Sequence, residues 1–194
     1  MLSEHIIAEI RRGGPMGFDR FMEIALYDPE AGYFATGALR SDRAGDFLTS
    51  PEVSPLFGET IAQFVAAERD RIGEPFTLIE VGGGSGSLLR PLLDALDPAP
   101  SVVAVERSAA ARAAIAERVP EADLAETVPA LRGVVIGNEL LDNMPAALVA
   151  RRDKGWSERV VNIEDDRLVL ADGEARPEVT AWAEAHAGPV PDGG

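Results

Sequence analysis

Four polar side chains stand where three apolar segments of the chain end. They are Glu80, Glu106, Asn138 and Glu139. Each apolar segment has the length of a buried strand, and ligands of open α/β sheets bind where the carboxyl ends of parallel strands meet. Carboxylate and amide oxygens at such an edge accept hydrogen bonds from hydroxyl and ammonium groups. The sequence therefore predicts one crevice lined by acidic and amide groups.

A glycine-rich loop follows the first of these segments. Four glycines fall within the five positions Gly82–Gly86. Glycine lets the backbone take positive φ and lets a ligand approach without meeting a Cβ atom. A tight strand-to-helix turn without a ligand is the alternative, but a run of this density disfavours it. We predict that Gly82, Gly84, Gly86 and Ser87 bind a cofactor.

The spacing within the loop distinguishes between possible cofactors. A Walker phosphate loop requires Lys-Ser/Thr after its last glycine, but Ser87-Leu88 follows Gly86. A dinucleotide fingerprint fails as well, because its third glycine falls on Ser87 or Leu89. S-adenosylmethionine has no phosphate and carries a sulfonium cation and an α-amino group, so the carboxylate of Glu80 suits its charge. A nucleotide-dependent oxidoreductase is the interpretation that this spacing disfavours.

The two other strand ends supply the remaining predicted cofactor contacts. Glu106 lies 20 residues beyond Gly86, about the distance at which the next strand end returns to a cofactor's ribose. Its carboxylate can accept hydrogen bonds from both ribose hydroxyls. A surface glutamate at the start of a helix is the alternative. Asn138 follows the third segment, beside the same predicted crevice.

Strand and helix patterns alternate from residue 76 onward. Strands are predicted over 76–81, 101–105, 122–125 and 133–136, with helices over 85–96 and 108–119. This alternation predicts a parallel sheet with helices on both faces, an α/β Rossmann-like core. Further predicted elements are a fifth strand over 147–151, a β-hairpin over 156–170 and a helix over 177–187.

The first 75 residues follow a different pattern. Apolar residues at helical spacing predict helices over 3–12 and 18–26, and Ser54-Pro55 predicts the start of a third. Residues 28–53 are rich in Gly, Pro, Asp and Ser, and a loop of that length is usually functional or disordered. We therefore predict a helical and loop extension over 1–75 that covers the active site, and a cofactor-binding core over 76–194.

Composition limits the classes of partner. The 194 residues suffice for one domain, and the formal net charge is −15 at pH 7. That charge disfavours nucleic acids and anionic membrane surfaces and suits a basic protein segment, although a merely solvated acidic surface is the alternative. The chain has no cysteine, and its two histidines, His5 and His186, are far apart, which disfavours a metal site.

The N-terminus and the hydropathy pattern indicate the expected location. Met1–His5 lacks the basic and apolar regions of a signal peptide, and no apolar run approaches the roughly 20 residues that span a bilayer. We therefore expect no membrane insertion and a cytoplasmic protein. The Ala- and Arg-rich composition indicates a bacterial source.

Several long segments resemble the MidA-like class I methyltransferases. These segments are Gly14–Phe18, Tyr27–Phe34, Gly45–Ser54, Glu80–Leu88 and Asn138–Pro145. The family includes a mitochondrial complex I assembly factor with protein-arginine methyltransferase activity. The eukaryotic members of the family act on a complex I subunit. The resemblance implies methyl transfer from S-adenosylmethionine, with an arginine of a partner protein, such as a respiratory complex subunit, as the acceptor.

Methyl transfer to an arginine requires more than in-line positioning. A guanidinium is otherwise always protonated, so a carboxylate that orients it and receives its proton would serve the reaction. Glu139 is the first candidate for this catalytic role, with Asp46 and Glu52 as alternatives. For these two, structural roles remain equally open: Asp46 as an acceptor in a turn and Glu52 as a charge near a helix N-terminus.

The sequence also departs from the family pattern. Gly83 stands where the family often has proline, and the later Asp-Tyr-Gly segment is absent. The resemblance therefore implies that the C-terminal strands of the sheet are missing from this chain, which is expected to be a fragment or, as the alternative, a shortened member that completes its sheet through a partner. An open sheet edge exposes unpaired backbone groups, which favours association, including a homodimer. A non-catalytic, cofactor-binding assembly factor is the alternative function.

Overall fold

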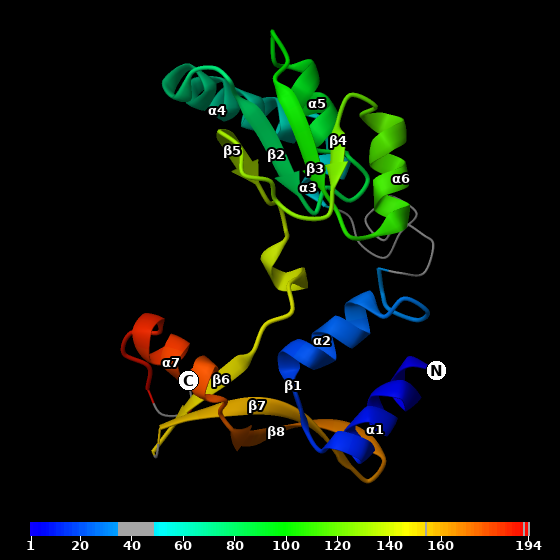
Figure 1. Ribbon diagram of the computed structural model, residues 1–194, viewed down its shortest axis with the longest axis vertical. Coiled ribbons are helices and arrows are strands. Elements are labelled where there is room, and N and C mark those ends of the chain that lie inside the picture. Colours follow the sequence, from blue (N-terminus) through cyan, green and yellow to red (C-terminus); the bar gives the residue numbers. More distant parts are fainter. Residues whose placement is uncertain (35–48, 154, 192, 194) are drawn as a thin grey trace. The chain divides into compact units, whose positions relative to one another are not determined.

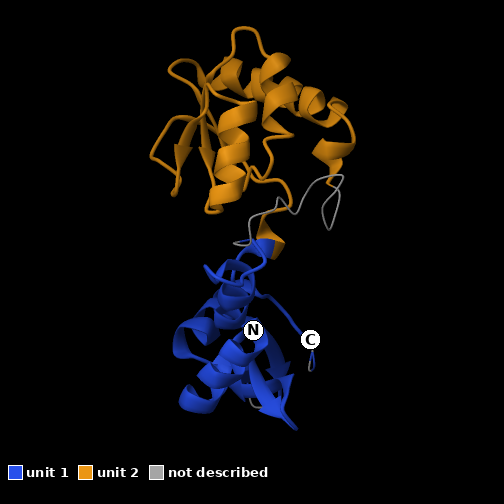
Figure 2. Cartoon of the chain, turned by 90° about the vertical axis from the view of Figure 1, so that its right-hand side faces the viewer, with its two compact units in different colours: residues 1–36, 143–194 blue, residues 37–142 orange. Residues whose placement is uncertain are grey.

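The computed structural model describes residues 1–34, 49–153, 155–191 and 193, which belong to two compact units. Unit 1 combines Met1–Thr36 with Asn143–Gly194, and unit 2 consists of Gly37–Asp142 (Figure 2). The predicted division at residue 75 therefore differs from the observed one. The reason is that the first two helices bury their apolar faces against the C-terminal hairpin, and the third helix packs on the parallel sheet.

The parallel sheet predicted from the sequence forms the centre of unit 2. Its strands are β2 (Thr77–Val81), β3 (Ser101–Val105), β4 (Asp123–Ala125) and β5 (Gly133–Ile136). Their spatial order is β4-β3-β2-β5, and all three pairings are parallel (Figure 1). Leu78 lies opposite both Val102 on β3 and Val134 on β5.

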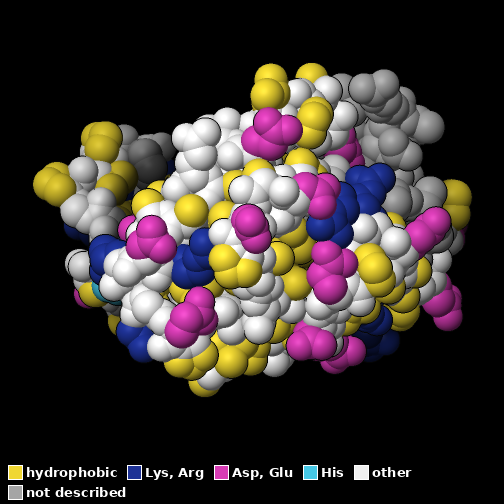
Figure 3. Space-filling view, turned by 90° about the horizontal axis from the view of Figure 1, so that it is seen from above, with side chains coloured by type: hydrophobic (Ala, Val, Ile, Leu, Met, Phe, Trp, Pro, Cys, Tyr) yellow, Lys and Arg dark blue, Asp and Glu magenta, His cyan; other side chains and the backbone are white. Residues whose placement is uncertain are grey.

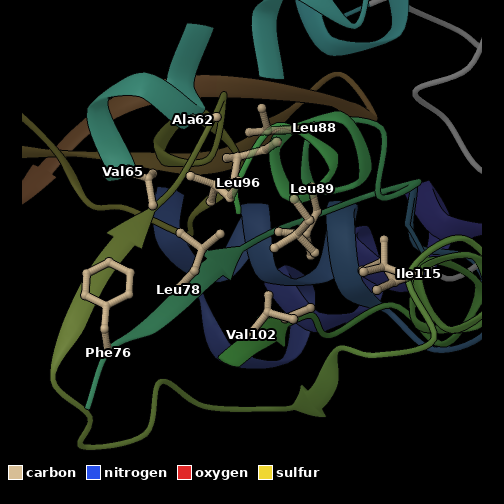
Figure 4. Packing of buried hydrophobic residues seen from close by; sticks show 13 residues of the cluster. Ala62, Val65, Phe76, Leu78, Leu88, Leu89, Leu96, Val102 and Ile115 are labelled. Atoms are coloured by element: carbon tan, nitrogen blue, oxygen red, sulfur yellow. The ribbon is translucent and has the colours of Figure 1, made fainter. Parts of the chain in front are cut away.

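Three helices of unit 2 bury one face of this sheet. They are α4 (Leu56–Ile72), α5 (Leu89–Asp94) and α6 (Ala109–Arg118). Side chains from all three converge on Leu78 and Val102, as Figure 4 shows for Val65, Leu89 and Ile115. Helix α5 begins four residues later than predicted, because the glycine loop continues through a further turn before the helix starts.

Helices on both faces of the sheet were predicted, but the described helices α4, α5 and α6 all contribute to the same core cluster. The smaller cluster on the other face contains only strand residues among those described. The topology explains this difference. The steps from β2 to β3 to β4 run in one direction, so right-handed crossovers place α5 and α6 on one face. The return from β4 to β5 over residues 126–132 contains no helix.

Unit 1 contains an antiparallel sheet. Its strands are β1 (Met16–Gly17), β6 (Leu148–Arg152), β7 (Gly155–Glu164) and β8 (Arg167–Glu174), with β7 paired to each of the others. The predicted hairpin is confirmed as β7 and β8. The strand predicted over 147–151 forms as β6, but it does not join the parallel sheet as a fifth strand. Only two residues separate β6 from β7, and a connection that short is open only to antiparallel strands.

The helices of unit 1 confirm those predicted over 3–12, 18–26 and 177–187. They are α1 (Leu2–Gly13), α2 (Phe18–Tyr27) and α7 (Pro177–His186). Ile6, Ile10 and Ile24 of the first two helices pack with Met16 and Val161 in a separate hydrophobic core.

A buried ion pair fixes the start of α7 in unit 1. Glu158 on β7 is only 1% exposed. Both of its carboxylate oxygens accept hydrogen bonds from Arg176, and Arg176 also donates to Asp19 on α2. The pair therefore joins three elements of unit 1. None of the helices in the described part of the chain has the length and hydropathy of a membrane span.

Candidate functional site

Strand β2 is the topological switch point of the parallel sheet. The chain passes from β2 to β3 on one side, and β5 pairs with β2 on the other. Ligands of open α/β sheets bind outside the carboxyl ends of the strands at such a point. There the Gly82 N–H donates to the Val105 carbonyl at 2.9 Å, and the Glu106 N–H donates to the Ala125 carbonyl at 3.0 Å. The predicted residues Glu80 and Glu106 are thus brought to one edge of the sheet.

The glycine loop uses the conformations for which glycine is suited. Gly82, Gly84 and Gly86 have φ values of 72°, 54° and 73°, a region that other residues rarely adopt. The Gly86 N–H donates to the Gly83 carbonyl at 2.8 Å, which closes a tight turn. A Cβ atom at Gly83 would lie 2.9 Å from Oε2 of Glu80, so the loop runs close over that carboxyl group.

Glu80 is a buried carboxyl group with an unused acceptor. The residue is 3% exposed, and its Oε2 atom has no hydrogen-bond partner among the described residues. Burial, with a smaller contribution from the charge of Glu106, raises the pKa of Glu80 to about 8. A buried polar atom without a partner is costly. A ligand with an ammonium or hydroxyl donor would supply the missing hydrogen bond, so the site fits the predicted cofactor.

Glu106 connects the glycine loop to the start of α6. Its Oε2 atom accepts from the Gly84 N–H at 3.3 Å, and its Oε1 atom accepts from the Ser108 N–H at 2.8 Å. Ser108 in turn caps α6 through the Ala111 N–H. A carboxylate has about four acceptor positions, so Glu106 retains capacity for ribose hydroxyls.

Glu52 reaches the glycine loop through a residue that sequence reasoning missed. It lies on a short helix, α3 (Ser50–Val53), whose capping box it forms with Thr49. Its Oε1 atom accepts from the hydroxyl of Ser85 at 3.2 Å, and Arg118 of α6 donates to the same hydroxyl at 3.4 Å. Ser85 is only 5% exposed. The Thr-x-x-Glu pattern was the sequence signal that could have predicted this helix.

Asn138 and Glu139 follow the end of β5, as predicted. Glu139 is exposed and has a φ of 49°, which is uncommon for a residue other than glycine. Such conformations concentrate at functional sites. Leu140, which sequence reasoning missed, packs close to two strand-end loops: Cβ atoms built at Gly82 and Gly137 would each lie 2.9 Å from its methyl groups.

The remaining predicted residues can be placed only in part. Ser87 lies in the loop before α5 and is partly exposed. Asp46 lies outside the described residues. The described residues contain no group of three or more acidic or histidine side chains arranged to bind a metal ion. Acidic side chains are scattered among basic and apolar ones on the face of the molecule seen in Figure 3.

Comparisons with known proteins indicate a family for the chain. A sequence profile of the family described as "Putative S-adenosyl-L-methionine-dependent methyltransferase" matches residues 56–188. A protein from Burkholderia thailandensis, whose crystal structure was solved bound to S-adenosyl-homocysteine, is 36% identical with a TM-score of 0.79. That likeness covers 100% of this chain and 54% of the Burkholderia protein.

Curated relatives with related names are also similar to the chain. The mitochondrial protein arginine methyltransferase NDUFAF7 homolog of Drosophila melanogaster is 37% identical over 97 residues, which cover 49% of this chain and 22% of the fly protein. The mouse protein arginine methyltransferase NDUFAF7 is 25% identical over 86% of this chain and 48% of its own length. In the longer alignments the chain thus spans about half the length of its relatives.

Proposed function

Because the chain belongs to this family of S-adenosyl-L-methionine-dependent methyltransferases, we propose that unit 2 binds S-adenosylmethionine at the carboxyl ends of β2, β3 and β5. The observation that carries the proposal is the buried carboxyl group of Glu80, whose Oε2 atom has no partner beneath a glycine-rich loop at the switch point. The crystal structure of the Burkholderia relative, bound to S-adenosyl-homocysteine, supports the choice of cofactor.

Each element of the site has a defined part in cofactor binding. Glu80 accepts a hydrogen bond from a donor of the ligand and, when ionised, attracts its positive charge. Gly82, Gly84 and Gly86 let the ligand approach the backbone, with Ser87 beside them. Glu106 accepts from the ribose hydroxyls, and Asn138 borders the ligand from the end of β5. These are the same cofactor-binding residues that the sequence predicted.

The bound cofactor supplies an activated methyl group on a sulfonium. We propose a protein arginine as the acceptor, because several relatives are named protein arginine methyltransferases. Glu139 is exposed at the end of β5 and can therefore meet a side chain of a partner protein. In this role it orients the guanidinium and receives a proton as the methyl group is transferred. The acidic net charge of −15 suits a basic target segment.

Calorimetric titration with S-adenosyl-homocysteine tests cofactor binding. The chain is expected to bind it saturably, and Gly84→Val is expected to abolish binding, because valine is strained at a φ of 54°. Gly73→Val is the matched control: Gly73 has a φ of 75° in the same unit but precedes β2 at its amino end. Absence of binding by the folded chain, or saturable binding of NADH instead, would refute the proposal.

A transfer assay with arginine-containing peptides then tests catalysis. Glu139→Gln is expected to abolish methyl transfer and to keep the affinity for S-adenosyl-homocysteine, because the amide cannot accept the proton. Full activity in this variant would remove Glu139 from the catalytic role. Cofactor binding without any transfer by the unsubstituted chain would favour the alternative of a non-catalytic assembly factor.

A further inference from the structure

We propose that Glu52 is a positioning residue that ties helix α3 to the glycine loop through Ser85 and thereby holds the loop in its ligand-binding shape. The inference rests on the proposed function, because it assumes that the loop binds the cofactor. It assigns Glu52 a role different from the proton acceptor considered from the sequence.

The contacts of Glu52 support positioning over proton transfer. Its Oε1 atom accepts from the Ser85 hydroxyl at 3.2 Å, and its Oε2 atom accepts from the Thr49 N–H at 3.3 Å. Both oxygens therefore have donors within unit 2. A proton-accepting role would require Glu52 to leave one of these partners, whereas a positioning role uses the geometry as it stands.

Ser85 is the anchor of the loop. It is buried at 5% exposure between Gly84 and Gly86, both of which have left-handed φ values. Glycine-rich segments lose more conformational freedom on ordering than other segments do. The hydroxyl of Ser85 is held from two sides, by Glu52 of α3 and by Arg118 of α6. These contacts supply an order that the glycines themselves do not provide.

Helix α3 depends on the same contacts. It has only four residues, and an isolated helix of that length is not stable in water. Its capping box and the burial of Pro51 contribute, and Glu52 joins the capping box to the loop. Because coupling between two sites is reciprocal, a ligand that orders the loop also stabilises α3.

Titration with S-adenosyl-homocysteine tests this coupling, because that ligand lacks the sulfonium charge and reports loop geometry more than net charge. Glu52→Ala and Ser85→Ala are each expected to weaken binding by about tenfold, the range for a lost hydrogen bond to a charged group. The double variant is expected to bind no more weakly than either single variant, because both remove the same contact. Glu52→Gln keeps a carbonyl acceptor and is expected to recover most of the affinity.

Glu59→Ala is the matched control, since it removes an exposed carboxylate from α4 in the same unit. Unchanged affinity in Glu52→Ala and Ser85→Ala, a loss as large in Glu59→Ala, or additive losses in the double variant would overturn the inference. If Glu52 had only a structural role, Glu52→Ala would lower thermal stability, and its effect on affinity would be independent of the effect of Ser85→Ala.

Hydrogen exchange of the free protein gives a second test that needs no ligand. Amides over residues 82–88 are expected to exchange about tenfold faster in Glu52→Ala and Ser85→Ala than in the unsubstituted chain, and to be unchanged in Glu59→Ala. Unchanged exchange in the first two variants would overturn the inference. If the unsubstituted chain fails to bind S-adenosyl-homocysteine, the proposed function fails, and the exchange experiment still decides whether the Glu52–Ser85 contact orders the loop.

Discussion

The burial of Glu80 makes the stability of unit 2 depend on pH. Its pKa rises from the usual 4.5 to about 8, chiefly through burial and further through the charge of Glu106. The folded state therefore retains a proton that the unfolded state has lost between these two pH values. The contribution of Glu80 to stability is therefore fully present below pH 4.5 and is lost as the pH rises through 8. Glu80→Gln keeps the shape of the side chain and removes the titration, so it is expected to remove this dependence.

The magnitude follows from the difference between the two pKa values. A difference of about 3.5 corresponds to about 5 kcal/mol between strongly acidic and strongly alkaline solution. Linkage predicts that the free energy of unfolding of unit 2 decreases by about 3 kcal/mol between pH 5.5 and pH 8.5 through Glu80 alone. In Glu80→Gln this decrease is absent. The difference in the free energy of unfolding between the two proteins is therefore expected to shift by about 3 kcal/mol in favour of Glu80→Gln between pH 5.5 and pH 8.5.

The assay has to report unit 2 alone. Both tryptophans and both tyrosines, Trp156, Trp182, Tyr27 and Tyr33, lie in unit 1, so intrinsic fluorescence reports the other unit. Pulse labelling of the β2 amides in increasing urea, read by mass spectrometry, follows the sheet that carries Glu80. A difference between the two proteins that is the same at both pH values, or that changes in the opposite direction, would refute the reasoning. Glu59→Gln controls for the loss of one surface charge.

Three further substitutions test other parts of the structure. Gly82→Ala is expected to weaken S-adenosyl-homocysteine binding by about tenfold or more in calorimetry, because its φ is 72° and the added Cβ would lie 2.9 Å from Leu140; equal affinity would contradict the loop geometry. Leu92→Ala removes a fully buried side chain and is expected to destabilise unit 2 by about 2–5 kcal/mol in the same pulse-labelling assay. A loss below about 1 kcal/mol would contradict its place in the core. Glu158→Gln is expected to lower the stability of unit 1 by about 2 kcal/mol, because it breaks a buried pair whose partner Arg176 is partly solvated. Tryptophan fluorescence during urea unfolding measures this loss, and an unchanged midpoint would show that the pair contributes nothing.

Local patterns predicted the elements that position the site. All four parallel strands and the long helices were predicted from strand and helix patterns and turn residues, and the polar groups at the strand ends follow from the apolar runs. The strand over 147–151 was also predicted, but its sheet was not. An apolar run specifies a strand, whereas its partner depends on the connection that follows, which here has only two residues before β7.

The contacts of Glu52 show a second limit of sequence reasoning. A carboxylate close to a helix start is compatible with capping, charge compensation and catalysis, and the sequence left these alternatives open. The contact that distinguishes them joins Glu52 to Ser85, 33 positions along the chain, and a third element supplies Arg118. Such contacts arise from the packing of α3 and α6 around the loop, which no local pattern specifies.

Two buried glutamates differ in how the fold accounts for their burial. Glu158 and Glu80 are 1% and 3% exposed, so each is removed from water to nearly the same degree. Glu158 has Arg176 on both oxygens and joins three elements of unit 1, which accounts for its burial within the fold. Glu80 has a like charge nearby and an oxygen without a described partner, so its burial costs stability. The unfavourable burial of Glu80 lies at the carboxyl end of β2, and the left-handed conformation of Glu139 lies just beyond the carboxyl end of β5. Destabilising features of this kind persist where function requires them. Their presence at one edge of the sheet therefore argues for a ligand that offsets them.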